Sequence, residues 1–146
     1  MYAHILIATD GSDLADRALD HALVVAKALN SDVTVVTVSE SPAMLGAYGD
    51  GFYAVDQNEL IEGQDQAAKA LLDKAEAKAK AAGVAVKTVH VKDSYPAEGI
   101  IATAESIGAG LIVMGSHGRR GLGRLILGSQ TNNVLAHTKT PVLVTR

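Results

Sequence analysis

The chain has 146 residues, of which 48% are hydrophobic, and a formal net charge of -3 at pH 7. This length suits one domain, residues 1–146, with a substantial buried core, and the hydrophobic content excludes a disordered chain. The net negative charge argues against binding to nucleic acid or to an acidic membrane surface, and without cysteine there are no disulfides and no thiol chemistry. No signal peptide precedes the first strand-like run, and no apolar run has the length of a membrane helix, so we expect a cytoplasmic protein.

In the first part of the chain, short apolar runs alternate with helical patterns. Residues 3–9 predict a strand buried on both faces, which stops at Asp10, and Ser12 is expected to cap the helix that follows. The helical spacing predicts that this helix buries one stripe, made of Leu14, Ala18, His21, Val25 and Leu29. Residues 33–38 are rich in valine and predict a second buried strand.

The middle of the chain begins with an irregular segment, residues 39–55, whose length and aromatic residues suggest a lid or a contact surface. A long helix is expected over 56–82, with a capping box at Asp56 and Glu59, i,i+4 pairs such as Asp65 with Lys69, and a terminating Gly83. A third strand is expected over 84–91.

The last part of the chain continues the alternation. Pro96 suits the first turn of a helix that should end near 108–110, and a short apolar strand follows at 111–114. After a loop over 115–127 come a short helix at 128–137 and a fifth strand at 141–145. The fold class is therefore α/β, with one open, parallel, five-stranded sheet and helices on both faces. A strand order of 3-2-1-4-5, which the alternation alone does not prove, would bring the ends of strands one and four together, where ligands bind in such sheets.

The loop after the fourth strand has a composition suited to phosphate. Backbone amides can approach an anion closely at residues without a Cβ, and arginine neutralises phosphate oxygens. The loop contains Gly115, Gly118, Gly121, Gly123, Gly128, Arg119, Arg120 and Arg124. The helix expected at 128–137 adds amino-terminal amides and the positive end of its dipole. The alternative is an ordinary loop whose arginines only face the solvent.

The glycine spacing resembles a known family. Gly115-x2-Gly118-x9-Gly128-Ser129 reproduces the motif G-x2-G-x9-G-[ST] of the universal stress protein family, in its ATP-binding branch. The resemblance extends over the whole chain, including 8–10, 114–118 and the closing strand from Pro141. It implies a Rossmann-like fold of the adenine nucleotide alpha hydrolase type. Ala8 stands where many members carry proline, a difference of little expected effect because the site uses only strand backbone there.

The resemblance also implies roles for individual residues. Asp10 would hydrogen-bond the nucleoside, and Val38 would read the adenine through its backbone. Ribose and phosphates would be held by Gly115, Gly118, Gly128, Ser129 and Gln130. The candidate nucleotide site further includes Ala8, Thr9, Met114, His117, Arg119 and Thr131. His117 is equally consistent with a side chain that faces the solvent, and Asp10 with a turn or capping residue.

Other kinds of site fit the sequence less well. The loop lacks the lysine of a P-loop, and methionine at 114 departs from the glycine of a nucleophile elbow. His21 is expected in the core, and the remaining histidines lack partners at metal-ligand spacing, so Mg²⁺ is expected only with a bound triphosphate. We expect a nucleotide-dependent switch or interaction module for stress signalling. The alternative is a slow ATPase or a nucleotide-transferring enzyme. The sequence leaves open the protein partner and the choice between ATP, ADP and AMP.

The closing strand also suggests self-association. In the order 3-2-1-4-5 it lies at an edge of the sheet, and Pro141–Arg146 is apolar and rich in β-branched residues. Two such edges can pair about a two-fold axis, and many members of the family dimerise in this way. We therefore predict a homodimer through Pro141–Arg146, the alternative being that a loop or helix covers this strand.

Overall fold

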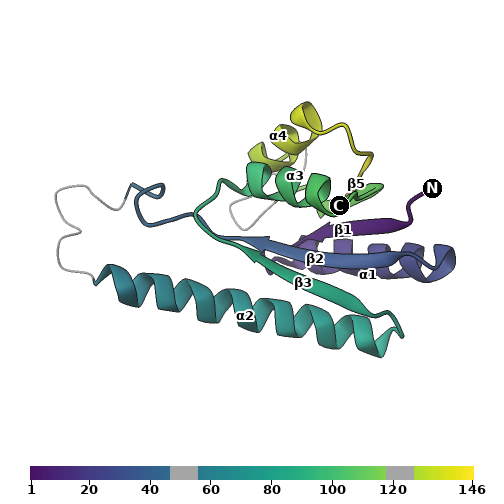
Figure 1. Ribbon diagram of the computed structural model, residues 1–146, viewed down its shortest axis with the longest axis horizontal. Helices are drawn as coiled ribbons and strands as arrows, with labels where there is room; N and C mark the ends of the chain where they lie inside the picture. Colours follow the sequence, from purple (N-terminus) through teal and green to yellow (C-terminus); the bar gives the residue numbers. More distant parts are fainter. Residues whose placement is uncertain (47–55, 118–126) are drawn as a thin grey trace.

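The structure is a computed structural model that describes residues 1–46, 56–117 and 127–146. Its five strands form one sheet in the order β3-β2-β1-β4-β5, and every neighbouring pair is parallel (Figure 1). The strands are β1 His4–Ala8, β2 Asp32–Val38, β3 Val86–Val91, β4 Leu111–Gly115 and β5 Val142–Thr145. The predicted fold class and strand order are confirmed.

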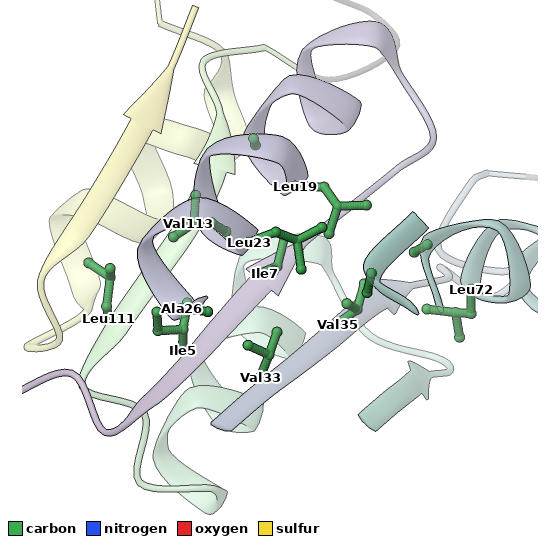
Figure 2. Packing of buried hydrophobic residues seen from close by; sticks show 14 residues of the cluster. Ile5, Ile7, Leu19, Leu23, Ala26, Val33, Val35, Leu72, Leu111 and Val113 are labelled. Carbon is green, nitrogen blue, oxygen red and sulfur yellow. The ribbon is translucent and has the colours of Figure 1, made fainter. Parts of the chain in front are cut away.

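Four helices cover the two faces of this sheet (Figure 1). They are α1 Asp13–Leu29, α2 Gln57–Ala81, α3 Pro96–Ser106 and α4 Ser129–His137. Alternate strand residues point to opposite faces, so the sheet builds two cores. Ile7 and Val35 pack with Leu23 of α1 on one face (Figure 2), whereas Leu6 and Val36 pack under α3 and α4 on the other. In the described part of the chain, no helix is long and apolar enough to cross a membrane.

The buried face of α1 matches the predicted one only in part, at Ala18 and at the partly buried Val25. Its buried residues are Ala15, Ala18, Leu19, Ala22, Leu23 and Ala26. His21 is exposed and Leu29 is 50% exposed, so the prediction of a core histidine was wrong. Helical spacing allowed two apolar stripes on this helix. The one that faces the sheet is rich in alanine, whose small side chain lets a helix lie close to the strands.

The predicted cap of α1 is confirmed, and the predictions for α2 are confirmed in part. The amide of Ala15 donates to Ser12 Oγ at 3.2 Å, as expected of a helix cap. Asp56 caps α2 by accepting from the amide of Asn58, and Gly83 follows the helix with φ +76°. Lys69 pairs with Asp73 instead of the predicted Asp65, whose carboxylate lies near His90 of β3 and pairs with Lys92 directly after that strand.

Candidate functional site

The carboxyl ends of β1 and β4 lie side by side in the middle of the sheet. The chain leaves β1 toward α1 on one face, and the helix that comes next after β4, α4, covers the other face (Figure 1). In α/β sheets, a ligand-binding crevice usually lies at the edge where the chain diverges in this way, and we call the region between the ends of β1 and β4 the crevice. Asp10 follows β1, and Ser116 and His117 follow β4, so the two predicted segments do come from neighbouring strands.

A tight turn follows β1 and holds Asp10 at this edge. Asp10 Oδ1 accepts from the amide of Ser12 at 2.9 Å, and Thr9 Oγ1 accepts from the amide of Gly11 at 3.2 Å. Gly11 has φ +79°, a conformation that favours glycine. The half-buried Asp10 thus stabilises the turn that leads into α1, as its alternative interpretation predicted. Thr9 is buried and its amide donates to the carbonyl of Val36 at 2.9 Å.

Val38 is the last residue of β2 and extends beyond the end of β1. The pairing of β1 with β2 ends at Ala8 opposite Val36, whose carbonyl faces β1. Backbone groups two residues apart in a strand point the same way, so the N–H and C=O of Val38 face the crevice. The side chain of Val38 packs against α3 so tightly that a Cβ at Gly99 would lie 2.8 Å from Val38 Cγ2. This contact holds the end of β2 in place.

Besides Thr9, three of the predicted site residues around β1 and β4 are buried in the fold. Ala8 is 7% exposed and Met114 6%, and both side chains belong to the core under α3 and α4. Only their backbone can therefore contact a ligand. Gly115 is buried beneath the first turn of α1, where a Cβ would lie 3.1 Å from the carbonyl carbon of Leu14. Its glycine allows β4 and α1 to approach each other, a packing role that the sequence motif did not reveal.

The amino end of α4 is fastened to the end of β4. The amide of Gly128 donates to the carbonyl of Ser116 at 2.8 Å. Thr131, which is 2% exposed, donates its hydroxyl to the carbonyls of Gly115 and Ser116 at 3.1 and 3.2 Å. These bonds use the Thr131 side chain within the protein, so only its backbone amide can reach a ligand.

The first turn of α4 presents backbone donors at this edge. Its first helical bond is donated by the amide of Asn132 to the carbonyl of Gly128, and Gly128 makes no side-chain cap. Within the described ranges, the amides of Ser129, Gln130 and Thr131 therefore have no hydrogen-bond acceptor. Free amides at a helix start favour an anion. Ser129 is exposed, so its hydroxyl is accessible as a further donor.

The side chain of Gln130 joins two helices. Its Oε1 accepts from the amide of Ala97 in the first turn of α3 at 3.1 Å. Tyr95 precedes α3 and makes no side-chain cap, so Gln130 supplies a cap from another element. The amino ends of α3 and α4 consequently lie close together, and this role of Gln130 was not predicted.

His117 lies at the end of the described part of the loop. Its Nδ1 is 3.0 Å from Ser116 Oγ, and its Nε2 is buried without a hydrogen-bond partner among the residues that the structure describes. Predictions for Gly118, Arg119, Arg120, Gly121, Gly123 and Arg124 concern residues outside the described ranges, as does most of the proposed lid at 39–55. Over 1–46, 56–117 and 127–146, no group of three or more acidic, histidine or cysteine side chains could hold a metal ion.

Comparisons with known proteins agree with this architecture. The model of the universal stress protein family matches residues 1–146. The chain belongs to that family. Universal stress protein MJ0531 of Methanocaldococcus jannaschii is 34% identical over 146 residues, which cover all of this chain and 83% of the relative. The predicted resemblance to the universal stress protein family is thus confirmed.

Solved structures of universal stress proteins share the fold. MJ0577 of Methanocaldococcus jannaschii, solved as a test case for assigning biochemical function from structure, superposes with a TM-score of 0.83 at 31% identity, covering 99% of this chain and 96% of the other. A universal stress protein solved in complex with cAMP superposes with a TM-score of 0.70 at 28% identity, covering 99% and 97%.

Proposed function

We propose that this universal stress protein binds an adenine nucleotide, ATP in particular, in the crevice between β1 and β4, and that occupancy switches its association with a partner. The observation that carries the proposal is the amino end of α4. Bonds from Gly128 and Thr131 hold it beside the end of β4, and Asp10 follows the neighbouring strand β1. The universal stress protein in complex with cAMP supports a ligand that combines adenine with phosphate.

Each part of the nucleotide has a counterpart in the crevice. Adenine carries a donor and acceptors on its edge, which suit the N–H and C=O of Val38. The carboxylate of Asp10 is an acceptor for ribose hydroxyls. Phosphates would accept hydrogen bonds from the amides at the start of α4 and from the hydroxyl of Ser129. Gly118 of the motif and Arg119 of the same loop would contribute further contacts. A hydrogen bond to a charged group contributes roughly 1.5–3 kcal/mol, so three or four account for the ~8 kcal/mol of a micromolar complex.

The glycine at 128 supports this assignment. Gly128 has φ -60° and ψ 152°, an extended conformation that any residue adopts. The backbone conformation therefore does not require glycine here, and a need for open space in front of the helix explains it better. Mg²⁺ would accompany the triphosphate, held by phosphate oxygens and water, because the described residues offer no cluster of metal ligands.

A homodimer through β5 forms the second part of the proposal. β5 pairs only with β4, so in the described structure no strand covers its outer edge. Leu143 is 36% exposed on this strand. An apolar edge of this kind pairs readily with a second copy about a two-fold axis. A dimer whose interface lies next to β4 would connect the nucleotide site of each chain with the assembly.

Titration calorimetry with ATP, ADP, AMP and cAMP tests the binding proposal. Gly128→Val would place a branched side chain in the phosphate position, so we expect ATP binding to be lost while the melting temperature stays close to that of the wild type. Gly63→Val is the matched control, because a Cβ at Gly63 meets nothing within 4 Å. Equal ATP affinity in both variants and the wild type would refute the site. Light scattering with and without ATP tests the switch, which requires a change in association.

A further inference from the structure

A group of polar side chains lies at the carboxyl ends of β2 and β3, on the face that α2 covers. His90 Nε2 is 2.5 Å from Ser39 Oγ, and His90 Nδ1 is 3.8 Å from Asp65 Oδ1. Lys92 Nζ is 2.6 Å from the second oxygen of Asp65. Serine, histidine and carboxylate thus follow one another in the order found in hydrolases, with the carboxylate at an ion-pair distance from the ring that is longer than a hydrogen bond.

This group is separate from the nucleotide crevice. Successive strand residues point to opposite faces, and Val38 packs on the α3 side of the sheet. Ser39 therefore points to the α2 side, where Asp65 and His90 lie. Neither the glycine motif nor the proposed adenine contact involves these side chains.

The surroundings of His90 favour a neutral ring with the proton on Nδ1. Burial lowers the pKa of His90 below its ordinary value of 6.5, with an opposing contribution from Asp65 on α2 and a supporting one from Lys92, which directly follows β3. The carboxylate of Asp65 attracts a proton at the nearer nitrogen, Nδ1. We assign this tautomer because it leaves Nε2 as an acceptor for the Ser39 hydroxyl.

The bond between Ser39 and His90 is not needed to hold the local backbone. The amide of Ser39 donates to the carbonyl of Val91 at 2.8 Å, and its carbonyl accepts from the amide of Ser94 at 3.3 Å. Gln64 of α2 also donates to the carbonyl of Glu40 at 3.0 Å. Since three bonds already anchor this segment, the hydroxyl and the imidazole are available for chemistry. The His90 side chain is 16% exposed and Ser39 is half-buried, so a small molecule can reach them.

We propose that Ser39 is a nucleophilic serine that accepts an acyl group from small activated esters, with His90 as its base and Asp65 as a positioning residue. Ser39 Oγ forms a bond to the carbonyl carbon of the ester, and its proton passes to His90 Nε2. The bond from that carbon to the leaving oxygen breaks, and this oxygen takes the electron pair. It leaves as an alcohol after accepting the proton from His90, or as a phenolate while His90 releases that proton to water. The product is an O-acylserine.

The test uses p-nitrophenyl acetate with the full chain. One acetyl group is expected on Ser39, with one equivalent of p-nitrophenolate released in the same phase. Hydroxylamine removes an ester-linked acetyl group but leaves acetylated lysine intact, so mass spectrometry before and after this treatment identifies the serine adduct. Ser39→Ala should abolish it.

Two further variants separate chemistry from structure. A general base contributes about 100-fold or more, so His90→Gln should slow acetylation of Ser39 by at least ~100-fold. Asp65→Asn should shift the pH dependence of the rate, which a purely structural carboxylate would not do. Circular dichroism and the melting temperature show that each variant is folded.

Ser106 provides an internal control. It is exposed on α3, and its hydroxyl donates to the carbonyl of Thr103 at 2.9 Å instead of to a histidine. If exposure alone decided reactivity, Ser106 would react faster than Ser39. Equal labelling of the two serines, or a rate in His90→Gln within about twofold of the wild type, would overturn the proposal. Either result would leave the nucleotide proposal intact.

Discussion

Gly115→Ala tests whether this motif glycine serves packing instead of phosphate binding. The added Cβ would lie 3.1 Å from both the carbonyl carbon and the Cβ of Leu14, and 3.3 Å from the nitrogen of Ala15. Carbon atoms prefer separations of about 3.5–4.0 Å. The closest neighbours belong to the backbone and first side-chain atom of α1, so relief requires the helix to move by several tenths of an ångström.

Overpacking of this kind costs about 1–3 kcal/mol. For a domain of this size, each kcal/mol lowers the melting temperature by roughly 2–4 °C. Urea unfolding followed by circular dichroism should therefore show reduced stability, and calorimetry should show that folded Gly115→Ala still binds ATP within about tenfold of the wild type. Gly63→Ala, with open space around its Cβ, should lose no stability.

The opposite pattern would refute the packing argument. Unchanged stability of Gly115→Ala together with lost ATP binding would mean that Gly115 contacts the ligand directly. Gly128→Val is expected to show that second pattern, so the two variants distinguish the two ends of one motif.

Four further predictions follow from the site, the edge strand and the polar group under α2. Asp10→Ala should weaken ATP binding by about 1.5–3 kcal/mol if the carboxylate binds ribose, or lower stability by only ~1 kcal/mol if it serves the turn; calorimetry and urea unfolding of the same variant decide between these. ATP hydrolysis should be slow or absent, and a turnover number within ~1–1000 per second would contradict this. Leu143→Lys should give a monomer that still binds ATP by light scattering and calorimetry, whereas Val142 packs against the core and is a poorer site for the test. Folding lowers the pKa of His90, so this side chain binds a proton more strongly in the unfolded chain than in the folded one. The stability associated with His90 is therefore present above pH 6.5 and is lost as the pH falls through the folded-state pKa. Urea unfolding measured across this pH range should show the loss in the wild type, and His90→Gln should remove it.

Signals within a few residues determined most of the secondary structure. Runs of valine, leucine and isoleucine predict the buried strands β1 and β2. Ser12 predicts the start of α1 because its side chain caps the helix, and Gly83 predicts the end of α2 because it adopts a positive φ. The glycine motif and the strand ends identified the family, and the strand order in the structure agrees with it. The sequence also predicted a helix over 128–137, and α4 begins at Ser129.

Only the tertiary structure decided which groups face one another. Gly115 lies against α1, Gln130 caps α3, and Ser39 meets His90 across 51 residues of sequence. The buried stripe of α1 was predicted only in part: Ala18 is buried and Val25 packs against the core, but contact with the sheet selected a neighbouring stripe that is rich in alanine. Local sequence patterns predict the hydrogen bonds that form within one segment. Which side chains share a crevice depends on strand order and helix placement, and these arise from packing between segments far apart in the chain.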